Sequence, residues 1–294
     1  MILEVIGVIA PFFLVLAAGF GYARRFPTNL DDANLLNLRV FTPALVFSGL
    51  TSAPIDFSRM GMLVLVVAVV MVGSGLLSWQ AARFFKLPRR VFTACMVFTN
   101  TGNMGMPLAL LAFGEKGFQL AVLVFVTVNL LHFSLGLAMY SGQWRLRKII
   151  GSPNVIACFL ALACNYWSIS LPKSLDFSID LLGQVCIPLM IFSLGVRLAG
   201  VDLSHWKTGL VGAVVCPASG LLAALVCVWL IPMPPQYQQS LLLFAALPPA
   251  AINLLMAERY RNHPEVTASL VFVGNIASLV VMPLVLLAMQ LYYQ

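Results

Sequence analysis

Charged side chains are scarce in this sequence, and their scarcity excludes a protein that folds in water. Only 9% of the 294 residues are charged, and 61% are hydrophobic. In soluble proteins about a quarter of the residues are charged. No charged tail or long polar stretch interrupts the apolar sequence, so we see no soluble domain. The composition predicts an all-α integral membrane protein, with the lipid bilayer as its solvent.

Motifs of catalysis and of metal binding are missing too. The sequence contains no HExxH, no GxSxG and no CxxC pair, and its six cysteines lie in apolar stretches as small core residues. A membrane enzyme would need a nucleophile with a base, or metal ligands at helical spacing. The net charge of +7 does not indicate a nucleic-acid partner, because the cations cluster in short loops. We therefore expect no enzyme, no metal, no cofactor and no nucleic acid.

Long apolar runs dominate what is present. A helix needs about 20 apolar residues to cross a bilayer. Ten such runs follow one another, separated by short stretches rich in proline, glycine and charge, at about 3–23, 34–52, 60–84, 92–113, 117–141, 152–170, 178–198, 208–231, 238–257 and 265–292. The sequence therefore predicts ten transmembrane helices.

The basic residues predict how these helices are oriented. Fourteen Lys or Arg residues, Arg145, Arg147, Lys148 and Arg197 among them, fall in the odd-numbered connections, and three fall in the even-numbered ones. Cytoplasmic loops carry the excess of Lys and Arg. The first run begins without a positive region and is followed by Arg24 and Arg25, which favours a retained helix over a signal peptide. Both termini are expected outside the cytoplasm, in a bacterial inner membrane.

The chain also contains an internal repeat. "FTPALVFSG" (41–49) resembles "CIPLMIFSLG" (186–195), and Pro43 matches Pro188 at a spacing of 145. Later, "LVFVTVN" (123–129) matches "LVFVGN" (270–275). We expect one five-helix repeat in 1–142 and a second in 151–294. Because five is odd, the second copy enters the membrane from the opposite side, an inverted repeat typical of secondary transporters.

One helix in each half is interrupted, in matching places. "NTGNMGMP" (100–107) lies inside the fourth run, and "LPPAAIN" (247–253) lies inside the ninth. Backbone groups freed by such breaks cannot stay unpaired in hydrocarbon, and the helix that follows a break offers N–H groups to an anion. Kinks or close helix packing are the alternative. As substrate-binding residues at two crossed breaks we predict Asn100, Thr101, Asn103, Pro107, Pro248, Pro249 and Asn253.

With these motifs the whole chain resembles the auxin efflux carrier family of membrane transporters. The resemblance rests on "APFFLVLAAGFGYARR", "FTPALVFSGL", "TNTGNMGMPLALLAFG", "IPLMIFSLGVRL" and "LPPAAINLLMAERY". It implies ten helices, a scaffold part, and a transport part in which the fourth and ninth helices cross. It also implies transport of an organic anion such as malonate or another carboxylate, with the prolines and asparagines of the crossing against the substrate. A long central cytoplasmic loop, typical of plant carriers, is absent here.

The sequence offers three candidate residues for a coupling-ion site. None of the ten acidic residues lies near the centre of a predicted span, which disfavours a carboxylate-paired cation antiporter. Asn129 and Asn275 match between the repeats and could form an ion site. His132 lies one turn after Asn129 and could carry a proton. The alternative is that these side chains only bond neighbouring helices. H⁺ and Na⁺ both remain open.

The resulting hypothesis is a secondary transporter that moves a small organic anion by alternating access. A passive anion channel and a membrane receptor for a carboxylate are the alternatives. A channel should show a polar stripe along several helices, whereas polarity is concentrated here at one depth. Glycines in the first and third runs ("GFG", "GSG") permit close packing, either within the chain or in a homodimer.

Overall fold

The computed structural model describes residues 2–52, 54–142, 153–200 and 205–293. Within these ranges the chain is all-α, with an isolated bridge between Thr99 and Pro249 and no strand. The predicted all-α class is therefore confirmed for the described residues. The basic residues Arg145, Arg147 and Lys148 and the boundary between the predicted halves lie outside them.

The first half alternates long helices with short helical segments. They are α1 (Ile2–Arg25), α2 (Asp31–Leu36), the π-helix η1 (Asn37–Phe41), α3 (Thr42–Thr51), α4 (Phe57–Phe84), α5 (Arg89–Val97), the π-helix η2 (Thr101–Gly105), α6 (Met106–Leu131), the π-helix η3 (His132–Gly136) and α7 (Leu137–Ser141). Gly114 has a positive φ inside α6, so a kink divides that helix.

The second half follows a similar order. It contains α9 (Pro153–Tyr166), α10 (Lys173–Ala199), α11 (Trp206–Leu230), α12 (Pro235–Ala245), α13 (Ile252–Arg259) and α14 (Pro264–Tyr293). In the described part of the chain, six helical segments are long and apolar enough to cross a membrane, whereas α9 is shorter. The integral membrane class is thus supported, and the count of ten spans stays a prediction.

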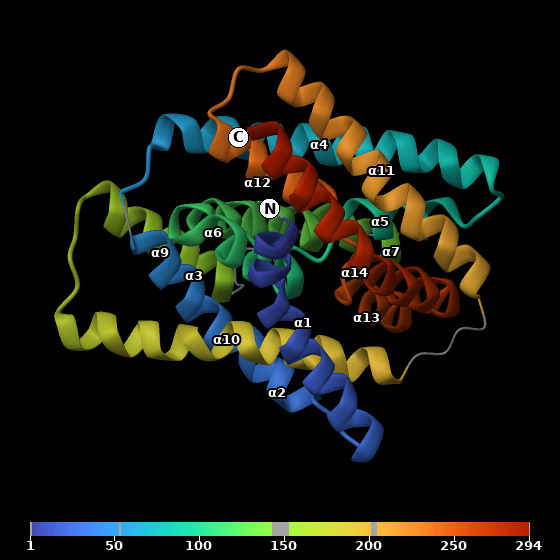
Figure 1. Ribbon diagram of the computed structural model, residues 1–294, viewed down its shortest axis with the longest axis horizontal. Helices are drawn as coiled ribbons and strands as arrows, with labels where there is room; N and C mark the ends of the chain where they lie inside the picture. The colour runs from blue at the N-terminus through green and yellow to red at the C-terminus, as the bar shows by residue number, and fades with distance from the viewer. Residues whose placement is uncertain (1, 53, 143–152, 201–204, 294) are drawn as a thin grey trace.

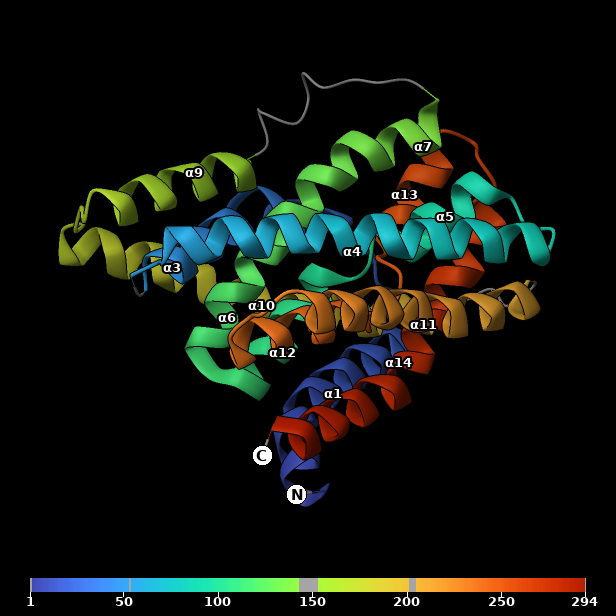
Figure 2. The same ribbon diagram turned by 90° about the horizontal axis from the view of Figure 1, so that it is seen from above.

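Three groups of helices surround a central one. Helices α4 and α11 lie side by side across one face, and α10 runs along the opposite face, where it packs against α1 and α3 (Figure 1). Seen from above, the start of α1 and the end of α14 lie close together (Figure 2). The segment Thr101–Ser141 is 67% buried in its most apolar window, against 33–44% for the other five. Helix α6 is therefore the core around which the others pack.

Large apolar side chains cover the outer surface. Leu14, Leu65, Val214 and Trp229 are each more than 60% exposed. A protein in water rarely leaves so much continuous apolar surface uncovered. These faces fit the hydrocarbon of a bilayer.

Glycines allow two pairs of helices to pack closely, one of them backbone to backbone. A methyl group on Gly195 of α10 would overlap the carbonyl oxygen of Leu16 in α1, and one on Gly19 of α1 would overlap that of Phe192 in α10. At Gly73 of α4, an added methyl group would lie 3.0 Å from the Cβ of Ala223 in α11, so these two helices also pack closely. Gly19 and Gly73, which belong to the predicted close-packing motifs, thus serve contacts within the chain, and the homodimer stays untested.

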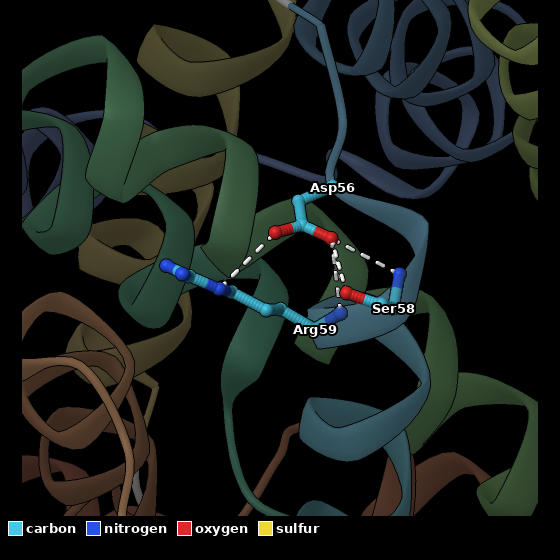
Figure 3. A network of polar contacts seen from close by, with 3 residues as sticks. All are labelled: Asp56, Ser58 and Arg59. Atoms are coloured by element: carbon cyan, nitrogen blue, oxygen red, sulfur yellow. Dashed lines mark hydrogen bonds and ion pairs between the residues drawn. The ribbon is translucent and has the colours of Figure 1, made fainter.

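The N-terminus of α4 is capped by an exposed carboxylate. Asp56 accepts hydrogen bonds from the backbone N–H groups of Ser58 (3.1 Å) and Arg59 (3.3 Å) and from the Ser58 hydroxyl (2.6 Å), and it pairs with the Arg59 guanidinium at 3.1 Å (Figure 3). The cap satisfies N–H groups that a helix start leaves open. The Ser58 hydroxyl is the main cause that lowers the pKa of Asp56 below its ordinary value, and the backbone bonds add to it.

We expect Asp56→Ala to lower the unfolding temperature of the detergent-solubilised protein at neutral pH. Because the folded state lowers the pKa of Asp56, its contribution is present above the unfolded pKa of about 4 and is lost as pH falls through the folded value. The difference between variant and wild type should therefore shrink in acid. Thermal unfolding at several pH values measures this, with exposed Asp180→Ala in α10 as the control. A difference that is unchanged in acid would contradict the cap.

Candidate functional site

Two helix breaks meet in the middle of the molecule. Helix α5 ends at Val97 and the chain becomes helical again at Thr101, while α12 ends at Ala245 and α13 begins at Ile252. The N–H of Asn100 donates to the carbonyl of Pro248 (2.8 Å), and that of Ala250 donates to the carbonyl of Phe98 (3.1 Å). The breaks therefore satisfy part of each other's backbone, as a non-helical backbone in lipid requires.

The local sequence explains where the second helix stops. Pro248 and Pro249 carry no N–H, and each disfavours a helical conformation in the residue before it. In the first break the helix restarts earlier in the chain than predicted. Pro107 lies just after the junction of η2 and α6, where the chain is already helical. The open backbone is at Phe98–Asn100, and the helix resumes well before Pro107, so the expectation of a half-helix that starts after Pro107 is wrong.

Three asparagines hold the crossing together. The amide of Asn253 donates to the carbonyl of Phe98 (2.8 Å), and the amide of Asn275 in α14 donates to that of Pro249 (3.0 Å). Asn100 donates in turn to Oδ1 of Asn275 (3.0 Å). All three side chains are at most 3% exposed. Their amides therefore replace the backbone partners that the breaks remove.

A tyrosine extends this network to α7. The hydroxyl of Tyr140 donates to Oδ1 of Asn253 (3.2 Å) and lies 3.4 Å from the sulfur of Cys95. The amide of Asn262, just after α13, donates to the Tyr140 carbonyl (3.1 Å). The carbonyl of Phe98 is thus fixed by Asn253, and Asn253 by Tyr140.

A cavity of about 110 Å³ lies against the crossing. Its polar lining comes from the first break, from α6 after its kink and η3, and from the start of α3, and its apolar lining includes Phe125, Val128 and Met190. The polar residues that line it are Thr42, Thr99, Asn100, Thr101, Asn103, Asn129 and His132. Its volume suits a small molecule rather than a long chain or a ring system.

A wider vestibule of about 430 Å³ adjoins this cavity. The two share lining residues from η1, α3, η2, α10 and α13: Leu38, Thr42, Asn103, Met190, Ala251 and Ile252. Farther out, the vestibule is lined by Asp31, Asp32 and Arg197. The arrangement forms a continuous route from a charged mouth to a polar, uncharged end at the crossing.

The structure divides the predicted substrate residues into two groups. Asn100, Thr101 and Asn103 line the cavity at the crossing, and Asn103, half-buried, lines the vestibule as well. Pro107, Pro248, Pro249 and Asn253 are buried and do not line either space. The second group builds the crossing rather than the cavity wall.

The predicted coupling residues divide similarly. Asn129 and His132 line the cavity, and the Asn129 amide donates to the Phe125 carbonyl one turn earlier (3.0 Å). Asn275 lies on the far side of Asn100, where its amide also donates to the Val271 carbonyl (2.7 Å). It lines a separate cavity of about 100 Å³, next to Arg197.

Sequence reasoning missed the wall that faces the crossing. Thr42 and Met190 come from the two copies of the repeated motif, "FTPALVFSG" and "CIPLMIFSLG", and Thr42 lies 3.4 Å from the sulfur of Cys186. The match between those copies was a signal that could have indicated them. The sequence analysis uses Arg197 only as one of the basic residues that predict membrane orientation, since nothing in the sequence shows that it lines a vestibule.

Comparison with known proteins decides the family. A model of the family described as "Membrane transport protein" matches residues 4–145 and 140–286. The chain belongs to this family, that of the auxin efflux carriers. Its crossing therefore occurs in a membrane transporter.

Relatives of this chain, at modest sequence identity, also have names that describe membrane transporters. The chain is 25% identical to the "Putative malonate transporter" of Rhizobium meliloti over 94% of this chain and 92% of that protein. It is 23% identical to "Uncharacterized transporter YfdV" of Escherichia coli K12, over 95% and 96% of the two chains. It is 27% identical to "Auxin efflux carrier component 6" of Arabidopsis thaliana, over 45% of this chain and a quarter of that carrier.

Proposed function

We propose that this family member is a secondary transporter that moves a small organic anion, such as malonate or another carboxylate, by alternating access. The observation that carries the proposal is the cavity at the junction of two broken helices, with a continuous vestibule on one side. The name of the Rhizobium relative supports the substrate class.

The anion is held, in this proposal, by neutral groups. Gly102 and Asn103, in the first turn after one break, and Ile252, in the first turn after the other, line the cavity. First-turn N–H groups lack partners inside their helix and favour negative charge. The Asn103 amide and the Thr101 hydroxyl add directional donors. Such a site binds one negative charge without a basic side chain.

We further propose that the chain spans the membrane ten times as two inverted five-helix repeats, 1–142 and 151–294. Contacts between matching residues support the symmetry. The hydroxyls of Ser74 and Ser219, 145 positions apart, lie 3.0 Å from each other, which is the spacing of the sequence repeat. The bridge between Thr99 and Pro249 is flanked by reciprocal backbone bonds. Equivalent residues contact each other in this way along a two-fold axis.

The helices then fall into two bodies that move relative to each other. Helices α1, α2, α3, α9 and α10 pack together as a scaffold, and α4–α7 with α11–α14 carry the crossing. The cavity lies between them, since Thr42 and Met190 come from the scaffold and Asn103 and His132 from the crossing part. With both termini outside an inner membrane, the vestibule opens to the cytoplasm, so this conformation faces inward.

Uptake into proteoliposomes tests the function. We expect labelled malonate to accumulate against its gradient, driven by H⁺ or Na⁺, with Asn129 and His132 at the cavity and Asn275 behind Asn100 as the proposed coupling residues. Flux that only equilibrates would indicate a passive channel instead. Binding without any flux would indicate a receptor.

Asn103→Ala tests the site. A hydrogen bond to a charged group contributes about 1.5–3 kcal/mol, so we expect uptake at low malonate concentration to fall about tenfold or more. Exposed Asn29→Ala, in the connection after α1, is the matched control and should keep wild-type uptake. Equal uptake by the two variants would remove Asn103 from the site.

A further inference from the structure

One polar atom in the cavity has no partner. His132 begins η3 and is 2% exposed, and its Nε2 is buried with no hydrogen bond of ordinary geometry, while the Asn253 side chain lies close to the ring. Its ring stacks on Phe98, with centroids 4.3 Å apart and planes 7° from parallel, and it lines the cavity together with Asn129 and Asn103. An unsatisfied buried polar atom costs free energy, and a ligand in this cavity could supply the missing bond.

The charges around the cavity are few. Of the described residues that line it, His132 is the one with an imidazole side chain, and none is Asp, Glu, Lys or Arg. On the elements that surround it, Tyr140 and Cys95 bond to each other on the side of Asn253. Arg197, Asp31 and Asp32 line the outer vestibule and not the cavity. Two negative charges on one ligand would therefore have no cation beside them.

This inventory limits the substrate, given the transport function proposed above. Burying an uncompensated charge is far more costly than burying a hydrogen-bonded neutral group. The helix starts and Asn103 serve one carboxylate. We propose that the cavity binds a short dicarboxylate together with one proton, shared between the second carboxyl group of the substrate and Nε2 of His132.

The proton balance of this step is simple. A dianion and one H⁺ enter the cavity, and the complex carries one net negative charge from them, whether the proton is on the carboxyl oxygen or on Nε2. No covalent bond in the substrate is made or broken. When the substrate leaves on the other side, the proton leaves with it, so His132 determines both the substrate class and the coupled ion.

Proton uptake on binding tests the proposal. Isothermal titration of the purified protein with malonate, in buffers of different ionisation enthalpy at about pH 7.5, counts the protons bound with the ligand. We expect about one proton per malonate and none per malonamate, a permanent monoanion that replaces one carboxyl group by an amide. Malonate affinity should fall about tenfold per pH unit above its second ionisation, while malonamate affinity stays constant.

Two variants separate recognition from folding. His132→Leu removes the polar atom, and we expect it to weaken the binding of both ligands about tenfold or more. His132→Gln keeps a donor and an acceptor and should retain malonamate binding within about threefold. Malonate binding without proton uptake in the wild type, or unchanged binding by His132→Leu, would overturn this inference alone. Failure of the wild type to bind or transport any carboxylate would overturn the proposed function as well.

Discussion

Replacing Asn253 by leucine is expected to disable uptake and to lower the unfolding temperature. The substitution removes one of the two donors to the Phe98 carbonyl and the acceptor for the Tyr140 hydroxyl, in a place where both groups are buried. We expect a loss of about 1–2 kcal/mol in stability, because hydrogen bonds inside membrane proteins are individually modest. Uptake should fall at least tenfold, since a small shift of the crossing misplaces every group in the cavity.

Asn129→Leu is the matched comparison for this prediction. Asn129 is half-buried, and its amide donates within its own helix to the Phe125 carbonyl. Its replacement should leave the unfolding temperature unchanged while it alters transport. Uptake assays and thermal unfolding in detergent measure the two effects. If both variants lower the unfolding temperature equally, Asn253 has no special part in holding the crossing.

Replacing Gly195 by alanine is expected to disrupt the scaffold. The added methyl group would overlap the Leu16 carbonyl oxygen and lie 2.9 Å from the backbone nitrogen of Phe20. Backbone atoms cannot rotate away as side chains do, so α1 and α10 must separate. Overpacking of this kind costs about 1–3 kcal/mol. We expect a sharp fall in the yield of monodisperse protein and in its unfolding temperature.

The control lies on the same pair of helices. Gly21 of α1 has no atom within 4 Å of an added methyl group. Gly21→Ala should therefore be neutral or slightly stabilising, because alanine favours a helix over glycine by about 1 kcal/mol. Size-exclusion profiles and melting curves of the two variants make the comparison. Similar profiles for both would mean that α1 and α10 are not packed through their glycines.

The sequence predicts where the two helices are interrupted, but not which side chains of the breaks face the cavity. Clusters of proline, glycine and asparagine inside apolar runs identify an interrupted helix, because these residues disfavour a continuous one. They do not tell which side chains face the ligand. Asn253 and Asn103 look alike in the sequence, yet one bonds the Phe98 carbonyl and the other lines the cavity. That difference arises from packing between segments about 150 residues apart, which a local pattern does not contain.

Pro107 and Arg197 are two further residues whose place in the structure the local sequence pattern does not predict. A proline inside an apolar run suggests that the helix breaks there, but the chain is helical from Thr101 on and continues through Pro107 into α6. Arg197 was assigned to membrane orientation, because a charge near the end of an apolar run ordinarily has that part. Its place on the vestibule depends on how α10 packs against α2 and η1.

The central claim is that the substrate lies in the cavity at the crossing. Single cysteines placed along the route test this by protection from a thiol reagent. Ile252 lines both the cavity and the vestibule, whereas Leu255 lines only the vestibule. Five of the six native cysteines are buried, so wild-type protein gives the background.

The decisive measurement is the labelling rate of Ile252→Cys with and without saturating malonate. We predict that malonate slows labelling of Ile252→Cys several-fold and leaves Leu255→Cys unchanged. Equal rates at Ile252→Cys with and without malonate, in protein that still transports it, would place the substrate elsewhere and contradict the account.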